Sequence, residues 1–453
     1  MKLFFFLIAS FTAFALEPFR VEIVEKGSNW PVPLVELRTV NHIRFFSDNN
    51  GFISLDAPEL MGREVWFDVL SPGYEIPKDG FGMRGVRFKV EPGKSKKIEI
   101  TRTIIAKRIG RITGAGIFSE SQKLGRELDW IESGIVGQDS VQNAVHNGKM
   151  FWIWGDTLIP NYPLGIFDGT GATTAIAPLR SFEPPLKLKL DYFTDAKNVP
   201  RGVAPVGGSG PTWITGFLTL PDKNGRERMV ASYMKIKPPL EIYRWGLCVW
   251  NDDTAKFEPL KIIWEKSETD PKPPKLIPDG HPAFWTDENG KRWALFGNPL
   301  PKVRCPATFE AWQDSSTWEQ LSPPESLLSA ADDAPVKLHS GSIAWNEFRK
   351  RWVAVFMQSF GKPSAHGEIW CAEAPKPNGP WGKAVKILTH DNYTFYNPRI
   401  HPEFTPANSP ILIFEGTYTK DFADRPHPTA RYEYNQILYR LDLDDPKLAP
   451  AQN

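Results

Sequence analysis

The sequence predicts an all-β protein, in which a small N-terminal antiparallel β-sandwich precedes a five-bladed β-propeller. Three observations support this fold class. Residues 17–107 hold short strands separated by turns, residues 137–157 have the pattern of a hairpin, and that hairpin pattern recurs four times along the rest of the chain. With 453 residues, the chain is long enough for two domains. The aromatic content of 13%, including 17 tryptophans, suits packing between sheets.

Residues 1–15 have the pattern of a secretory signal peptide. Lys2 precedes an apolar run at 3–9, and Ala13-Phe14-Ala15 provides an A-x-A cleavage site before Leu16. We therefore expect a secreted or periplasmic protein whose mature chain begins near Leu16. No later apolar run has the length that a membrane-spanning helix needs.

Charge and cysteine content restrict the partners and the chemistry. The 54 basic and 53 acidic side chains give a formal net charge of +1, which provides no surface for nucleic acid or an anionic membrane. Cys248, Cys305 and Cys371 are widely spaced and are expected to be buried free thiols. The sequence contains neither a phosphate-binding loop nor a G-x-S-x-G nucleophile motif, so we expect no cofactor.

The segment 17–107 is predicted to form the sandwich. Apolar and polar residues alternate with period two in short runs, and turn residues such as Ser47–Gly51 separate these runs. The expected strands include Val21–Val24, Val35–Arg38, Ile43–Phe46, Phe52–Leu55, Val65–Val69, Val86–Val90 and Lys97–Ile100.

The hairpin at 137–157 leads to the candidate site. Asn147-Gly148 separates two apolar runs, and this dipeptide is typical of a type I′ turn because both central residues need positive φ. Antiparallel pairing brings the start of the first strand beside the end of the second. Asp139 and Asp156 are therefore expected to meet at the open end of the hairpin.

The four later hairpins predict the propeller. They recur about every 60–70 residues, each followed or preceded by further strands, which is typical of propeller blades. Five blades fit the segment 108–445 and leave a C-terminal tail at 446–453; a two-sheet sandwich with extra hairpins is the alternative. The four repeats begin and end at 210–235, 279–298, 339–358 and 396–415.

Polar residues at the open ends of all five hairpins are expected to line one axial funnel. They are Asp139, Asp156, Lys235, Asp279, His281, Asn298, His339, Gln358, Asn397 and Glu415. Trp154, which directly precedes Gly155-Asp156, is the best candidate for a platform on which a sugar ring stacks. Grouped carboxylates suit glycoside hydrolysis, because one acid must stay protonated while the other is ionised. We expect a plant or algal polysaccharide or oligosaccharide as the substrate.

Two resemblances to known families follow from these motifs. The segments Pro31–Leu37, Asp48–Phe52 and Ser71–Tyr74 resemble transthyretin-like domains of the carboxypeptidase-regulatory type. Five blades, a first-blade acid and a polar funnel resemble the glycoside hydrolase family 43 superfamily of arabinanases and xylosidases. The segment Phe151–Thr157 further resembles secreted bacterial propellers linked to arabinan breakdown.

The resemblance to family 43 implies roles for individual residues. Asp139 would be the general base of an inverting hydrolase, Glu415 the general acid, and Asp156 or Asp279 the residue that tunes pKa or holds hydroxyls. Two departures are visible: Ser140 follows Asp139 where the family usually has proline, and the start of blade two, Gly208–Pro211, carries no acid.

Two other functions remain open at this point. A non-catalytic carbohydrate-binding propeller would spread its funnel acids too far apart to share one substrate bond. A polysaccharide lyase would need a base and a charge-neutralising partner, for which Lys235, His281 and Tyr396 are candidates. His281, His339 and His401 could hold a structural metal at the propeller axis, but their spacing matches no ligand motif, and polar lining is the favoured interpretation.

Overall fold

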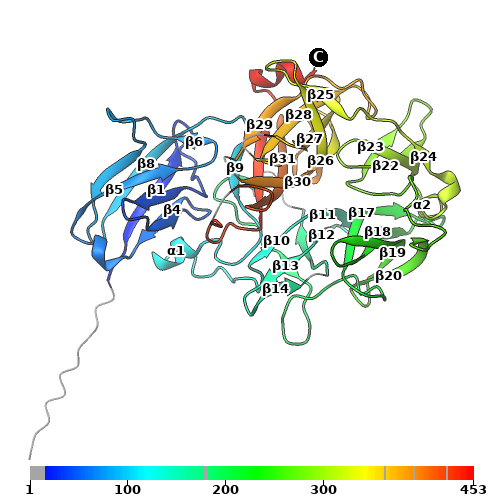
Figure 1. Cartoon of the computed structure of the whole chain (residues 1–453), viewed down its shortest axis with the longest axis horizontal. Coiled ribbons are helices and arrows are strands. Elements are labelled where there is room, and N and C mark those ends of the chain that lie inside the picture. Colours follow the sequence, from blue (N-terminus) through cyan, green and yellow to red (C-terminus); the bar gives the residue numbers. More distant parts are fainter. Residues whose placement is uncertain are drawn as a thin grey trace, which may run out of the picture.

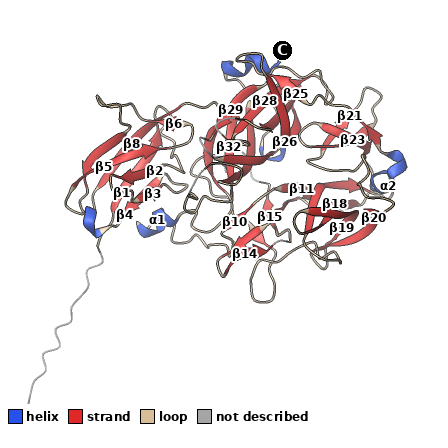
Figure 2. Ribbon diagram, viewed as in Figure 1, coloured by secondary structure: helices blue, strands red, loops and turns tan. Residues whose placement is uncertain are grey.

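The computed structural model describes residues 16–166, 168–176, 182–361, 364–390, 393–424 and 427–452. The predicted signal peptide, 1–15, lies outside the described residues. A sandwich of two sheets stands beside a ring of further sheets (Figure 1), and the helices are few and short (Figure 2). The helical segments are α1 (Ser119–Lys123), α2 (Phe309–Gln313) and the 3-10 turns Pro58–Leu60, Ser315–Thr317, Pro402–Phe404 and Pro446–Gln452. The prediction of an all-β fold is confirmed.

The N-terminal part is a sandwich of two four-stranded sheets. Ile98 and Ile100 face its core while Lys97 and Glu99 face solvent, as period-two alternation in a half-buried strand requires. One sheet has the order β4 (Phe52–Leu55), β1 (Phe19–Glu25), β8 (Ser95–Arg102), β6 (Tyr74–Glu75). The other has the order β3 (Arg44–Phe46), β2 (Glu36–Thr39), β5 (Glu64–Leu70), β7 (Gly85–Lys89). Its relation to transthyretin-like domains stays a prediction.

The ring consists of five antiparallel blades, as the repeats predict. Blade 1 has the strand order β11 (Gln142–His146), β12 (Lys149–Ile153), β15 (Gly171–Ala175), β16 (Asp191–Tyr192). Blade 2 has the strand order β17 (Thr212–Pro221), β18 (Glu227–Lys237), β19 (Glu241–Asn251), β20 (Lys256–Glu265). Blade 3 is β21 (Ala283–Thr286), β22 (Arg292–Gly297), β23 (Pro301–Pro306), β24 (Glu319–Gln320). Blade 4 is β25 (Ser326–Leu328), β26 (Pro335–Asn346), β27 (Arg351–Gln358), β28 (Glu368–Ala374), β29 (Val385–Thr389).

Blade 5 closes the ring with a strand from the start of the propeller sequence. Its order is β30 (Thr394–Ile400), β31 (Ile411–Thr419), β32 (Asn435–Asp442), β9 (Lys107–Arg111), and β9 pairs antiparallel with β32. The first and last segments of the propeller thus share one sheet, which ties the ring together. A small extra sheet of β10 (Gly137–Gln138), β13 (Thr157–Ile159) and β14 (Tyr162–Ile166) follows the open end of blade 1.

Apolar side chains fill the spaces between neighbouring blades. Phe151 of blade 1 packs in one cluster with Phe217 of blade 2, and Trp293 of blade 3 packs with Phe356 of blade 4. The middle strands are therefore buried on both faces; in β27 every residue between the two ends is buried. Because the blades bury their faces against each other, polar residues are left to strand ends and to the axis.

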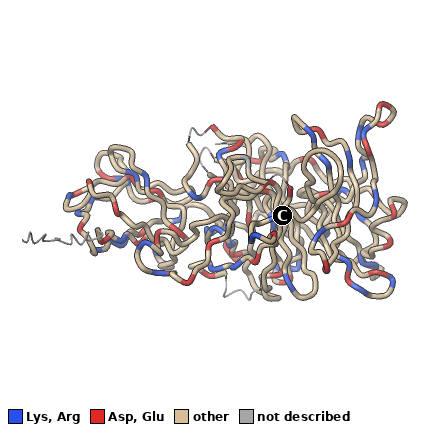
Figure 3. Tube along the Cα trace, turned by 90° about the horizontal axis from the view of Figure 1, so that it is seen from below, with Lys and Arg blue, Asp and Glu red and all other residues tan. Residues whose placement is uncertain are grey.

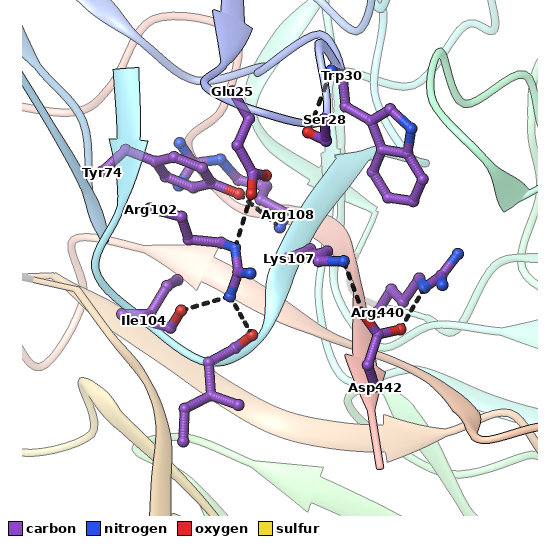
Figure 4. Close-up of polar contacts among 11 residues, drawn as sticks. Glu25, Ser28, Trp30, Tyr74, Arg102, Ile104, Lys107, Arg108, Arg440 and Asp442 are labelled. Carbon is purple, nitrogen blue, oxygen red and sulfur yellow. Dashed lines mark hydrogen bonds and ion pairs between the residues drawn. The ribbon is translucent and has the colours of Figure 1, made fainter. Parts of the chain in front are cut away.

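The junction between sandwich and propeller is built around β9. Arg108 points toward the sandwich, where its Nη1 donates to the carbonyl of Pro72 at 2.8 Å, and its backbone N–H donates to the Tyr74 hydroxyl at 3.2 Å. The neighbouring Lys107 pairs instead with Asp442 of β32 at 2.7 Å (Figure 4). Successive residues of β9 thus bond to different parts: Arg108 to the sandwich and Lys107 to blade 5.

The structure confirms the hairpin prediction at 137–157. Asn147 and Gly148 have φ of 48° and 72°, so both central turn residues are left-handed as a type I′ turn requires. His146 pairs with Lys149 and the ladder runs to Gln142 and Ile153.

The fifth hairpin ends later than the sequence predicts. Its second strand was expected to end at Glu415, whereas β31 continues to Thr419. A bulge between Tyr396 and Arg399 shifts the register, so that Tyr396 pairs with Thr417 and Arg399 with Glu415. Glu415 therefore lies inside the strand and not at its open end.

Two further sequence-based expectations concern the whole molecule. The three cysteines are free and buried, as predicted, and burial raises the pKa of the Cys248 thiol. Within the described ranges, no helix has the length and apolar character needed to cross a membrane. Basic and acidic residues are interspersed along the chain (Figure 3).

Candidate active site

Two carboxylates meet where the first blade opens toward the propeller axis. The backbone N–H of Asp139 donates to the carbonyl of Asp156 at 3.3 Å, and the N–H of Gly155 donates to the carbonyl of Asp139 at 2.8 Å. A Cβ atom at Gly155 would lie 2.4 Å from Asp139 Oδ1, so glycine is needed for this close approach. Asp139 and Asp156, called the acid pair below, are brought together as the sequence predicts.

Tyrosine hydroxyls hold the carboxylate of Asp139. Tyr396 at the start of blade 5 donates to Asp139 Oδ2, and Tyr434 forms a second side-chain hydrogen bond with this carboxyl. Burial raises the pKa of Asp139, while these two hydrogen bonds act in the opposite direction because they stabilise its ionised form. Among the described residues, the buried Oδ1 atom has no hydrogen-bond partner.

The pKa of Asp156, like that of Asp139, lies above its usual range. Burial, followed by the negative charge of Asp139, raises its pKa to about 7. Trp213 at the start of β17 donates its indole N–H to Asp156 Oδ1 at 3.3 Å, which orients the carboxyl and partly offsets the shift. A half-buried acid with a pKa near neutrality is suited to give up a proton during a reaction.

The backbone around the acid pair is strained. Ser140, Asn397 and Tyr434 are non-glycine residues with φ of 52°, 52° and 60°, in the left-handed region. Asn397 Nδ2 donates to Ser140 Oγ at 2.7 Å, and the Ser140 N–H donates to Thr417 Oγ1 at 3.1 Å. Such conformations cost on the order of 1–3 kcal/mol each, and three of them lie around Asp139.

Rings extend from the acid pair toward blade 4. Tyr396 lies 6.4 Å from Phe422, Phe422 lies 5.3 Å from His366, and His366 lies 4.6 Å from His339, measured between ring centroids. Phe422 is 66% exposed and His339 is also exposed. We call Tyr396, Phe422, His366 and His339 the aromatic strip. It provides faces on which sugar rings can stack.

Three predicted rim residues therefore lie beside this site. Asn397 bonds to Ser140, next to Asp139, and His339 ends the aromatic strip. The backbone carbonyl of Gln358 accepts a hydrogen bond from the imidazole of His366, and the buried Oε1 of Gln358 has no hydrogen-bond partner among the described residues. These residues lie where a substrate that follows the strip would pass.

The prediction that Glu415 lines the funnel is wrong. Its side chain is fully buried, and Oε1 lies 2.9 Å from Nε2 of His401. Burial raises the pKa of Glu415 well above its usual range, although the charge of Arg399 acts in the opposite direction. A carboxyl sealed in this position cannot reach a glycosidic oxygen.

Glu415 belongs to a buried polar layer across the axis, which we call the axial plug: Asn143, His281, Arg399, His401 and Glu415. Arg399 Nε donates to Asn143 Oδ1 at 2.7 Å, which fixes the amide so that its Nδ2 donates to His401 Nδ1 at 2.7 Å. His401 then carries its proton on Nε2 and donates it to Glu415. The network is a chain of directed hydrogen bonds.

The axial plug is a poor metal site. Burial lowers the pKa of His281 and His401 well below the usual range, so both imidazoles are neutral. The buried guanidinium of Arg399 lies beside both of them and would repel a cation. In the part of the chain that the structure describes, no group of three potential ligand residues is placed to hold a metal ion.

Lys235 has a structural role in place of the predicted substrate contact. Its buried ammonium donates to the carbonyls of Val206 and Gly210 at 3.1 and 2.6 Å and to Thr212 Oγ1 at 3.1 Å. All three protons are used to hold the loop that leads into blade 2.

Asp279 and Asn298 also connect blades. Asp279 Oδ1 accepts from Thr215 Oγ1 at 2.6 Å and from the Gly280 N–H at 2.7 Å, which links blade 2 to the segment entering blade 3. Asn298 Oδ1 accepts from the Gly341 N–H at 2.7 Å, which links blade 3 to blade 4. Neither residue contacts the acid pair through a described hydrogen bond.

The prediction that Trp154 is a sugar platform is wrong. Trp154 is 1% exposed and stacks on Trp152 with ring centroids 6.0 Å apart, so it fills the core. Trp213 is half-buried and is the tryptophan that contacts Asp156. Tyr434, which contacts Asp139 from a loop, had no signal in the sequence.

Comparison with known proteins gives only distant likenesses. No family model matches the chain, and no curated protein sequence matches it. An exo-1,5-α-L-arabinanase from a bovine ruminal metagenomic library is 12% identical, with 68% of this chain and 95% of that chain covered and a TM-score of 0.39. A putative exo-β-1,3-galactanase from Bifidobacterium bifidum is 12% identical, with 69% and 89% covered and a TM-score of 0.40.

An arabinanase from Bacillus subtilis is 9% identical, with 67% of this chain and 93% of that chain covered and a TM-score of 0.34. An N-acetylgalactosamine deacetylase from F. plautii is 8% identical, with 74% and 94% covered and a TM-score of 0.39. At these identities and scores the likeness carries no argument about chemistry. The function has to be inferred from the acid pair and its surroundings.

Proposed function

We propose that this protein is a glycoside hydrolase whose two catalytic carboxyl groups are Asp139 and Asp156. The observation that carries the proposal is that two carboxyl groups with different surroundings lie together at one end of the axis. Burial raises the pKa of both; two tyrosine hydroxyls act against this shift at Asp139, whereas the charge of Asp139 adds to it at Asp156 and brings that pKa to about 7. Glycoside hydrolysis needs one ionised and one protonated carboxyl.

In the proposed reaction, Asp156 donates its proton to the leaving glycosidic oxygen. Asp139, held by Tyr396 and Tyr434, acts on the anomeric carbon either directly or through a water molecule that it deprotonates. Trp213 keeps the Asp156 carboxyl oriented toward the bond that breaks. The proton-donor role assigned to Glu415 by family resemblance thus passes to Asp156, because Glu415 is sealed in the axial plug.

The aromatic strip suggests how substrate lies. A saccharide with one bond at the acid pair would place its next rings over Phe422 and toward His366 and His339. Exposed rings with polar neighbours suit the amphipathic faces of sugars. We therefore propose a polysaccharide or oligosaccharide substrate, met outside the cytoplasm if residues 1–15 direct export.

The lyase alternative receives less support from the same contacts. Lys235 uses all its protons within the protein, and His281 is buried in the axial plug. Burial and the adjacent Asp139 charge raise the pKa of Tyr396 well above its usual range, which makes it a poor base. The three residues that a lyase would need are thus not available together.

The decisive experiment measures reducing ends released from a panel of polysaccharides and aryl glycosides. Wild-type protein is compared with Asp139→Asn and Asp156→Asn, and with Asp191→Asn on the exposed outer strand of blade 1 as the matched control. We expect release by the wild type and the control, and loss in both acid-pair variants. Release that persists in either acid-pair variant would remove that residue from the mechanism, and binding without any release would establish a carbohydrate-binding propeller instead.

A further inference from the structure

A cavity opens at the end of the propeller axis that faces away from the acid pair. It has a volume of about 540 Å³ and is lined by the far halves of the inner strands of all five blades, including Val145, Leu220, Phe284, Trp345 and Arg399. The acid pair lies at the opposite ends of these strands, where the hairpins are open. Its size is typical of small-ligand sites.

The axial plug separates this cavity from the acid pair. Asn143 and Arg399 belong both to the plug and to the cavity lining, so the plug forms the cavity floor. His401 and Glu415 lie in the same layer and are fully buried. A ligand in the far cavity therefore cannot reach Asp139 or Asp156 through the axis, and the cavity is a separate site.

The floor of the cavity offers both donors and acceptors. Glu403, on the 3-10 turn Pro402–Phe404, lines the cavity, and its Oε2 has no hydrogen-bond partner among the described residues. Burial raises the pKa of Glu403, while the nearby Arg399 acts in the opposite direction. Glu227 and Arg292 also line the cavity. Two guanidinium groups and two carboxyl groups leave little net charge, which suits a neutral ligand rich in hydroxyl groups better than an anion.

The walls add aromatic faces. Phe284 and Trp345 are each 38% exposed, and both line the cavity. Trp345 donates its indole N–H to Glu347 at 2.7 Å, which fixes the ring, and the Arg292 guanidinium lies 4.5 Å from the Phe284 ring centroid. A second hollow of about 220 Å³ also borders Trp345, so this indole stands between two depressions.

We propose that the far cavity is a second carbohydrate-binding site, which takes a neutral sugar of a polysaccharide chain. The sugar ring stacks on Trp345 or Phe284, and its hydroxyl groups bond to Glu403 and Arg399. The choice of a sugar as ligand rests on the proposed function, whereas the separate site itself follows from the cavity and the plug. Such a site would hold the protein on a polymer while the acid pair works on another part of it.

The test uses Trp345→Ala and Phe284→Ala, each made in the Asp139→Asn background so that substrate is not consumed. Affinity electrophoresis in gels containing soluble arabinan, galactan or xylan measures binding, with polygalacturonate as the anionic comparison. Phe348→Ala, which removes a 41% exposed ring outside the cavity, is the matched control. Thermal melting identifies any variant that fails to fold, and the other variant then decides.

We expect the affinity of each cavity variant for at least one neutral polymer, measured from its retardation in the gel, to fall about tenfold, as when a central aromatic contact is removed. The control should bind like the parent. With intact Asp139, both cavity variants should hydrolyse small aryl glycosides at the wild-type rate. Unchanged binding, or retardation by polygalacturonate alone, would overturn the proposal. Cavity-dependent binding in a protein that hydrolyses nothing would instead refute the proposed function and leave the second site standing.

Discussion

The open mouth of the axis and the axial plug both contain a carboxylic acid whose pKa is raised by burial, but the two acids differ in their exposure. Asp156 is half-buried beside Asp139 and is oriented by Trp213, with a pKa of about 7. Glu415 is fully buried and bonds to His401. The comparison teaches that a raised pKa marks a buried acid, so the catalytic role proposed for Asp156 rests on its partial exposure and on the carboxyl beside it.

The largest expected difference between the two regions is in the rate of hydrolysis. Asp139→Asn should lower kcat by on the order of 10²–10⁴, the usual contribution of a positioned acid or base. Glu415→Gln should keep kcat close to the wild-type value, because the plug is sealed from substrate. Steady-state kinetics on an aryl glycoside, with thermal melting to confirm folding, measures both. If a folded Glu415→Gln protein lost as much kcat as Asp139→Asn, the conclusion that Glu415 is sealed from the substrate would be contradicted.

The pH dependence of the rate should sharpen the assignment within the acid pair. If Asp156 donates the proton, kcat/KM should fall as pH rises through about 7. Trp213→Phe removes a hydrogen bond that lowers the pKa of Asp156, so the alkaline limb should move to higher pH. Tyr396→Phe removes a hydrogen bond that lowers the pKa of Asp139, so the acidic limb of the profile should also move to higher pH. A Trp213→Phe profile that matches the wild type would argue against Asp156 as the acid.

Stability provides a test of Asp156 that does not depend on activity. Its folded-state pKa of about 7 exceeds the reference value of 3.8, so the folded protein binds more protons than the unfolded chain between these values. This carboxyl therefore lowers the free energy of unfolding as pH rises through that window. Asp156→Asn should gain about 1–3 kcal/mol relative to wild type between pH 4 and pH 8, reduced from the full linkage because the group is partly exposed. Urea denaturation at both pH values measures the free energy of unfolding of the variant and the wild type. A difference between them that is the same at pH 4 and pH 8 would contradict the raised pKa of Asp156.

The smallest effect is expected at Asp279, which the sequence placed among the catalytic candidates. Asp279→Asn keeps the oxygen that accepts from Thr215 and Gly280. We expect a change of less than about 0.5 kcal/mol in the free energy of unfolding, as for most exposed substitutions. The pH–rate profile should stay that of the wild type. An acidic or alkaline limb that is displaced in the pH–rate profile of Asp279→Asn would show that Asp279 influences the ionisation of the acid pair.

Local sequence signals predicted the strands and one half of the site. Asn147-Gly148 fixed the hairpin turn, and the turn together with strand pairing placed Asp139 beside Asp156. The repeats predicted five blades because each must bury both its faces against a neighbour. These features depend on residues close in the chain, where period and turn chemistry decide the structure.

The positions of the other predicted site residues depend on how strands distant in the sequence pair and pack. β30 begins at Thr394 and β31 runs on to Thr419, so Glu415 lies inside the strand and its side chain is buried. Asn397-Pro398 marks the bulge in the sequence, since proline inside a strand is typical of one, but no local pattern shows how far the paired strands extend. The same packing buried Trp154 and left Trp213 at the site, although both look alike as strand tryptophans.

The sequence by itself determined an all-β chain of repeated hairpins with two aspartates at the open end of the first. Only the tertiary structure decided which acids share a mouth of the axis and which are sealed within it. The physical reason is that burial, charge and access at the axis are properties of five blades packed together. Tyr396 and Tyr434 reach Asp139 across more than 250 residues of chain, and no local pattern records that contact.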